Sequence, residues 1–167
     1  SVDTDMWSDS LSLPFCVEDN GGFWVAGIKN GTRDSLLLKR YSPDGELMWE
    51  NPLPSDKPSI VPTWLVVSLD NQYTALMLSD WPTRSNQILY YDPNGNLLHT
   101  KELPYYFSGA EFVSNQEIVL YSGDEWELYQ LDALETPYIS GSFRGGVFNP
   151  LIAFPQENSF LVTSVLK

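Results

Sequence analysis

The stretch YSPDGELMWENPLP at residues 41–54 returns fifty positions later as YDPNGNLLHTKELP at residues 91–104. Both copies open on tyrosine, carry a Pro-x-Gly turn and close on Leu-Pro. The same offset pairs further residues without a gap from position 17 onward, including Val17 with Val67, Phe23 with Tyr73 and Ser35 with Ser85. The chain therefore contains a sequence repeat whose unit is about 45 to 50 residues long.

Within each unit the local signals favour β-strands. Short β-branched and aromatic runs, such as FWVAGI at 23–28 and YTALML at 73–78, alternate with polar loops. Pro43 and Gly45 in the first unit, like Pro93 and Gly95 in the second, suit a hairpin turn, because proline fixes φ and glycine accepts a positive φ. No helical periodicity is sustained, so the pattern predicts an all-β protein.

A second phrase, an apolar strand followed by an Asn- or Asp-containing turn and another apolar strand, occurs four times. We interpret its copies as the first two strands of successive four-stranded blades: they are residues 15–27, 65–77, 111–123 and 152–164. A repeat of this size and strand content predicts a β-propeller of about three and a half antiparallel blades in a single domain, residues 1–167. The expected blades span about 11–53, 61–103, 109–143 and, in part, 147–167.

Three and a half blades leave the question of ring closure open, because each blade buries its faces only against its neighbours. The chain is either part of a larger propeller, or it closes by self-association or with a second, different chain. A small four-bladed ring would require residues 1–10 to supply a missing strand.

The net charge of the chain limits the kinds of partner that it can bind. Nine Lys and Arg against twenty-two Asp and Glu give a net charge of −13, which disfavours a nucleic-acid partner. No apolar run approaches the roughly 18 residues of a membrane span. The polar, acidic opening SVDTDMWSDS lacks an initiator methionine, which suits a processed, secreted or periplasmic form. The single cysteine, Cys16, excludes an intramolecular disulfide and is expected to be a buried thiol.

Few residues could support catalysis. The single histidine, His99, is expected on the surface of an outer strand, and DPNGN at 92–96 is expected to be a plain β-turn. The acidic run DEWE at 124–127 could act as a metal or acid–base cluster, but we favour a solvated loop. The sequence therefore predicts no catalytic residue, no cofactor and no metal.

The blade assignment divides the loops between two faces. One face receives the connections between the second and third strands and between blades, which hold the cations Lys29, Arg33, Lys57, Arg84 and Arg144 beside aromatic residues. Its charge is roughly balanced, because the same connections hold the acids Asp34, Asp56, Asp80, Asp124 and Glu125. Arginine and aromatic side chains dominate recognition hot spots. We therefore expect a protein partner or an anionic small ligand to bind this face, which we call the loop face, through seven residues: Lys29, Arg33, Trp81, Arg84, Tyr105, Tyr106 and Arg144.

The opposite face, here the turn face, receives acidic turns without lysine or arginine. Its acids are Glu18, Asp19, Asp44, Glu46, Asp70, Asp92, Glu117, Asp132, Glu135 and Glu157. Asp and Asn favour tight turns for local hydrogen-bonding reasons, which accounts for most of this enrichment.

The phrase Y-x-P-D-G-x-L-x-W at 41–49 resembles the outer hairpins of quinoprotein-like bacterial propellers. Trp49 becomes His99 in the second copy, so the resemblance is not extended to a quinone cofactor. Propellers host many functions. We expect a non-catalytic binding or assembly module that acts through one loop face. The alternative is part of a larger propeller enzyme, an oxidoreductase or hydrolase, whose active site is completed by other blades or subunits.

Overall fold

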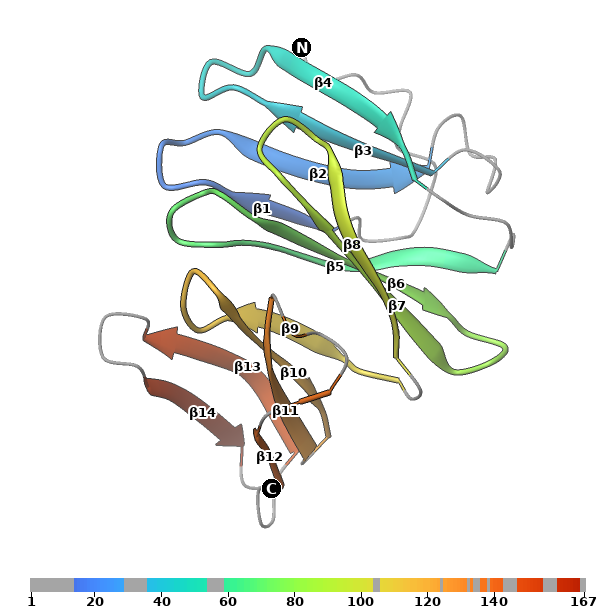
Figure 1. The fold of residues 1–167 in the computed structure, drawn as a ribbon, viewed down its shortest axis with the longest axis vertical. Coiled ribbons are helices and arrows are strands. Elements are labelled where there is room, and N and C mark those ends of the chain that lie inside the picture. Colours follow the sequence, from blue (N-terminus) through green and yellow to red (C-terminus); the bar gives the residue numbers. More distant parts are fainter. Residues whose placement is uncertain are drawn as a thin grey trace.

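The structure is a computed structural model (Figure 1), and it describes residues 14–28, 36–53, 59–103, 106–123, 125–131, 133, 136–137 and 139–142, together with the backbone of 147–154 and 159–165. Fourteen strands lie in these ranges. The described residues contain no helix long and apolar enough to cross a membrane.

Three four-stranded antiparallel sheets follow one another along the chain, each with its strands in sequence order. The first consists of β1 (Phe15–Val17), β2 (Phe23–Ile28), β3 (Leu36–Tyr41) and β4 (Leu47–Pro52). The second consists of β5 (Ile60–Val67), β6 (Thr74–Asp80), β7 (Ser85–Tyr91) and β8 (Leu97–Leu103). The third consists of β9 (Gly109–Phe112), β10 (Glu117–Ser122), β11 (Glu125–Gln130) and β12 (Ile139–Ser142).

A two-stranded sheet ends the described chain, with β13 (Val147–Phe154) paired to β14 (Ser159–Val165). The first strands of neighbouring sheets contact one another: β1 contacts β5, β5 contacts β9, and β9 contacts β13. Successive sheets joined along their first strands are the arrangement of propeller blades around an axis. The prediction of about three and a half antiparallel blades is therefore confirmed, whereas the single-domain assignment stays a prediction.

The repeated hairpins have the same local geometry, as their sequences predict. Gly45 and Gly95 adopt φ of 80° and 83°, a region that disfavours other residues. Each donates its backbone N–H to the residue three positions earlier, Ser42 or Asp92. Both hairpins also contain a register shift at the end of the third strand, next to Tyr41 and Tyr91. The recurrence of the phrase thus reflects recurrence of one turn.

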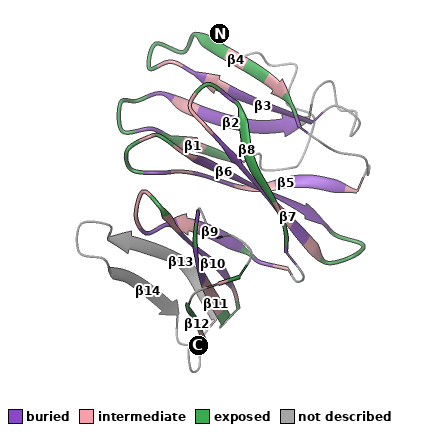
Figure 2. Ribbon diagram, viewed as in Figure 1, coloured by how far each residue is buried: buried purple, intermediate pink, exposed green. Residues whose placement is uncertain are grey.

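The apolar core fills the spaces between sheets. In β6, Leu76 and Leu78 pack toward the first sheet, whereas Ala75 and Met77 pack toward the third. The second sheet is therefore covered on both faces, which explains why its strands are continuous apolar runs. Figure 2 shows β6 and β7 largely buried, with the outer strands β4 and β8 largely exposed.

A buried ion pair lies in the first sheet, and its arginine also contacts the second sheet. The Arg40 guanidinium donates to both carboxylate oxygens of Glu18, at 2.7 and 2.9 Å, and its remaining Nη1 donates to the Pro93 carbonyl at 2.6 Å. Trp24 Nε1 also donates to Glu18, at 2.5 Å. Desolvation alone would raise the pKa of Glu18, but the hydrogen bonds from Arg40, Trp24 and Asn20 outweigh it and lower that pKa.

This ion pair corrects one assignment made from the sequence. Glu18 was counted among the acids of the turn face, but it is buried and its charge is compensated by Arg40 from β3. A second correction concerns DEWE: Glu125, Trp126 and Glu127 belong to strand β11 rather than to a loop, and Asp124 lies outside the described residues. His99 is exposed on the outer strand β8, as predicted.

Candidate binding face

A partly exposed aromatic pair marks the loop face in the described part of the chain. Trp81 follows β6 directly and is 60% exposed. Its ring lies 5.5 Å from that of Tyr106, between centroids, with an interplanar angle of 38°. Tyr106 precedes β9, so two connections distant in sequence meet here. Figure 1 shows the β6–β7 loop on the side of the molecule opposite the β1–β2 and β5–β6 turns.

The four-residue loop that carries Trp81 is held by hydrogen bonds at its base. Thr83 Oγ1 donates to Asp80 Oδ2 at 2.8 Å and lies 2.8 Å from the Ser85 hydroxyl. Arg84 adopts φ of 54°, which is uncommon for a residue other than glycine. Such backbone geometry persists only where the surroundings fix it, and it is concentrated at functional sites. Arg84 is thereby presented from a tight, fixed loop.

Hydrogen bonds with strands β7 and β10 hold the segment that carries Tyr106. Asn86, buried at the start of β7, donates its side-chain Nδ2 to the Phe107 carbonyl at 2.9 Å. The Phe107 ring belongs to the core between the second and third sheets. One residue later, the Ser108 backbone N–H donates to the Tyr121 carbonyl at 2.8 Å. Both contacts hold the peptide unit between Phe107 and Ser108, next to Tyr106, so the segment that carries Tyr106 is preorganised.

The sequence-predicted site is only partly described. Trp81, Arg84 and Tyr106 lie in the described residues, and the structure brings Trp81 and Tyr106 together. The other predicted members lie outside them: Lys29, Arg33, Tyr105 and Arg144. The complete seven-residue site therefore stays a prediction.

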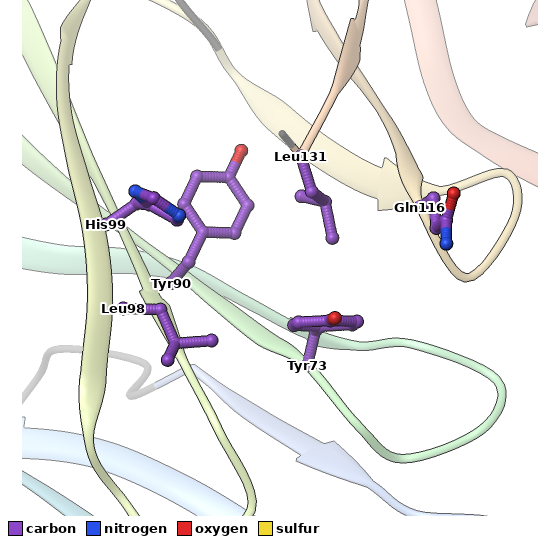
Figure 3. Close-up of a pocket in the computed structure, with 6 residues that line it drawn as sticks. All are labelled: Tyr73, Tyr90, Leu98, His99, Gln116 and Leu131. Atoms are coloured by element: carbon purple, nitrogen blue, oxygen red, sulfur yellow. The ribbon is translucent and has the colours of Figure 1, made fainter. Parts of the chain in front are cut away.

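A cavity of about 280 Å³ lies between the second and third sheets, a feature that sequence reasoning missed. It is lined by Tyr73, Tyr90, Leu98, His99, Gln116 and Leu131. Figure 3 shows Tyr73, Tyr90, Leu98 and Leu131 around a common space, with His99 beside Tyr90. Replacement of Trp49 by His99 between the two repeats was the available signal for this difference.

A second hollow of about 520 Å³ lies along the inner strands β1 and β5 and includes Cys16 and Glu111. Burial, with the charge of Glu18 adding to it, raises the pKa of the half-buried Cys16 thiol to about 12, so the thiol stays protonated and unreactive. Burial also raises the pKa of Glu111 to about 7. Among the described residues, no three His, Cys, Asp or Glu side chains are grouped as a metal site would require.

No protein-family model matches the sequence, and no curated protein matches it. Solved structures do match in fold. The C-terminal WD40 domain of Sif2 is 15% identical, with a TM-score of 0.64 over 91% of this chain and 40% of that one. The β-propeller domain of Myceliophteria thermophila Cps50 (Swd1) is 9% identical, with a TM-score of 0.62 over 90% and 48%.

A third match is KlAtg21, whose structure is a complex with the coiled-coil of AgAtg16. It is 11% identical, with a TM-score of 0.63 over 95% of this chain and 55% of that one. The chain thus spans about half the length, or less, of the propellers that it matches. At these identities the likeness shows the fold: the chain is made of β-propeller blades.

Proposed function

We propose that the chain is a non-catalytic protein-interaction module whose partner docks on the loop face, with the Trp81 and Tyr106 side chains as its central anchor. The observation that carries the proposal is an exposed tryptophan whose ring lies beside that of a tyrosine, at a tilt. A large exposed aromatic surface on a preorganised loop costs little entropy to bind, and tryptophan and tyrosine are enriched among interface hot spots. KlAtg21, which shares the fold, was solved with a coiled-coil bound.

We propose that an acidic group beside the partner's apolar anchor pairs with the basic side chains of this face. Arg84 is presented from the same loop as Trp81, and we propose that Lys29, Arg33, Tyr105 and Arg144 extend the surface. The rest of the protein carries excess negative charge, which steers acidic partners away from other faces. A secreted or periplasmic location, the lack of a nucleic-acid partner and the quinoprotein-like relationship stay predictions.

Replacement of Trp81 by alanine tests this proposal. Met48 provides the matched control, since it is 55% exposed on β4 in the first sheet. The tagged full-length protein is purified from its source cells, and co-purifying proteins are quantified by mass spectrometry. A hot-spot tryptophan is worth about 2 to 4 kcal/mol, so Trp81→Ala should reduce recovery of a specific partner by tenfold or more, and Met48→Ala should not.

Equal recovery from both variants would overturn the proposal. The alternative, a propeller enzyme completed by other blades or subunits, makes a different prediction in the same experiment. Its oxidoreductase or hydrolase activity would appear only in preparations that contain the completing subunit, and Trp81→Ala would leave assembly with that subunit intact.

A further inference from the structure

The cavity between the second and third sheets faces the turns rather than the loops. Tyr73 precedes β6, Gln116 belongs to the β9–β10 turn, and Leu98 and His99 lie on the outer strand β8. Leu98 is 41% exposed, so an apolar side chain at the mouth of the cavity is accessible to a partner. Burial raises the pKa of Tyr90, so its hydroxyl stays neutral at physiological pH.

The equivalent place between the first two sheets is filled by the chain itself. Residues fifty positions earlier than Tyr90 and His99 are Arg40 and Trp49. Both donate hydrogen bonds to the Pro93 carbonyl, Arg40 at 2.6 Å and Trp49 Nε1 at 3.1 Å. The Pro-Asn-Gly turn of the second sheet therefore packs against the first sheet. The third and fourth strands of the first sheet thus bind backbone carbonyls of a turn from the neighbouring sheet.

Between the second and third sheets, the residues that line the corresponding place differ from those between the first and second sheets. Tyr90 and His99 stand where Arg40 and Trp49 would, and Leu131 closes the cavity from the third sheet. Tyr73 and Leu98 replace Phe23 and Met48. The result is a largely apolar, aromatic space whose polar groups are the hydroxyls of Tyr73 and Tyr90 and the side chains of His99 and Gln116. Its volume of about 280 Å³ is at the lower end of ligand sites, enough for a side chain rather than for a large cofactor.

The rim of this cavity is negative. A groove of about 440 Å³ continues from it, sharing Tyr73, Leu98 and Gln116, and it adds the acids Asp70 and Asp92. Desolvation is the largest single influence on the pKa of Asp92 and raises it, but hydrogen bonds from Asn96 and Asn94 together lower that pKa, so the carboxylate stays ionised. No lysine or arginine is among the described residues that form the cavity or the groove.

Strand β8, which carries Leu98 and His99, also carries Lys101, whose ammonium group contacts an aromatic ring of the third sheet. Lys101 Nζ lies 4.4 Å from the centroid of the Tyr129 ring, on the core side of the third sheet. The groove therefore combines an apolar cavity with an acidic rim whose charge attracts cations.

We propose that this cavity and groove form a second docking site, distinct from the loop face, for a basic peptide segment of a protein partner. An aromatic or long aliphatic side chain enters the cavity against Tyr73, Tyr90 and Leu98, and flanking Lys or Arg residues lie beside Asp70 and Asp92. This site and the loop face share no residues, so either docking site can exist without the other.

The sole histidine provides the readout. Because His99 lies at the cavity, its imidazole proton signals in NMR report occupancy without ambiguity of assignment. The full chain is titrated with acetyl-Lys-Phe-Arg-amide, acetyl-Lys-Ala-Arg-amide and acetyl-Glu-Phe-Glu-amide. The first should shift the His99 signals saturably, with a dissociation constant of about 1 mM or below. The alanine peptide should bind about tenfold more weakly, since burial of a phenylalanine side chain accounts for at least that factor.

Leu98→Lys and Met48→Lys form a matched pair, because they place the same charge at corresponding exposed positions of neighbouring sheets. Leu98→Lys should weaken binding of the Lys-Phe-Arg peptide by tenfold or more, and Met48→Lys should change it less than twofold. The proposal is overturned if the His99 signals do not shift at up to about 10 mM peptide. It is also overturned if the three peptides bind equally, or if the two variants lose affinity to the same extent.

Discussion

Substitution of Gly95 by alanine tests how the first two sheets are held together. Gly95 has φ of 83° and lies directly against the first sheet. A Cβ atom added there would lie 2.7 Å from Asn51 Nδ2 and 3.0 Å from two ring carbons of Trp49. Neither side chain is free to move away, because Asn51 donates to the Gly95 carbonyl at 2.6 Å and Trp49 donates to the Pro93 carbonyl.

Gly45 is a control built into the repeat. It has almost the same φ, 80°, in the equivalent turn, but a Cβ there would meet nothing within 4 Å. Gly45→Ala should therefore cost only the positive-φ penalty, about 1 to 2 kcal/mol. Gly95→Ala should cost that penalty and a further 1 to 3 kcal/mol, approximately, for overpacking against Trp49 and Asn51.

Urea unfolding of the two variants, followed by tryptophan fluorescence, measures the difference. We expect a lower urea midpoint for Gly95→Ala than for Gly45→Ala, at an unchanged m value. Equal destabilisation by the two substitutions would contradict this expectation, because the first sheet would then accommodate a Cβ atom against Trp49 and Asn51 without strain.

Two further predictions concern buried charge. Arg40→Met should destabilise the chain by about 3 to 5 kcal/mol in urea unfolding, because Glu18 would be left buried without its cation, whereas Arg40→Met combined with Glu18→Gln should recover much of the loss. The pKa of Glu111 is about 7 in the folded state, against an ordinary value of 4.5. The free energy of unfolding should therefore fall as the pH rises between these two values, because Glu111 loses its proton at lower pH in the unfolded state than in the folded state. Glu111→Gln should remove that slope and stabilise the protein at pH 7.5, and an unchanged pH profile would contradict the assignment.

The sequence was sufficient for the parts of the fold that depend on local chemistry. Pro43 and Gly45, with Pro93 and Gly95, specify hairpin turns within a few residues, and the alternation of short apolar runs with polar turns located the paired strands. The repeat then fixed the order of the sheets without any knowledge of their contacts.

The contacts between sheets were not predictable in the same way. From the sequence, Glu18 was assigned to an exposed acidic turn. Its partner Arg40 lies on another strand, and the Pro93 carbonyl that Arg40 also binds lies in another sheet, so no local pattern indicates the ion pair. The cavity at Tyr90 and His99 requires side chains of two sheets to be placed together, and no short motif encodes that. The sequence predicted that Trp81 and Tyr106 lie on the same face, but not that their rings are in contact. That contact depends on Asn86, which holds the segment that carries Tyr106 through the Phe107 carbonyl.

The most direct test of the interaction proposal is site-specific photo-crosslinking of the full-length protein in its source cells. A benzophenone amino acid is placed at Pro82, exposed beside Trp81 on the loop face, and in a parallel variant at Asp44, exposed in the turn of the first sheet. A discrete protein adduct from position 82, absent from position 44 and lost on Trp81→Ala, is the predicted result. No adduct at position 82, or equal adducts at both positions, would contradict the central claim.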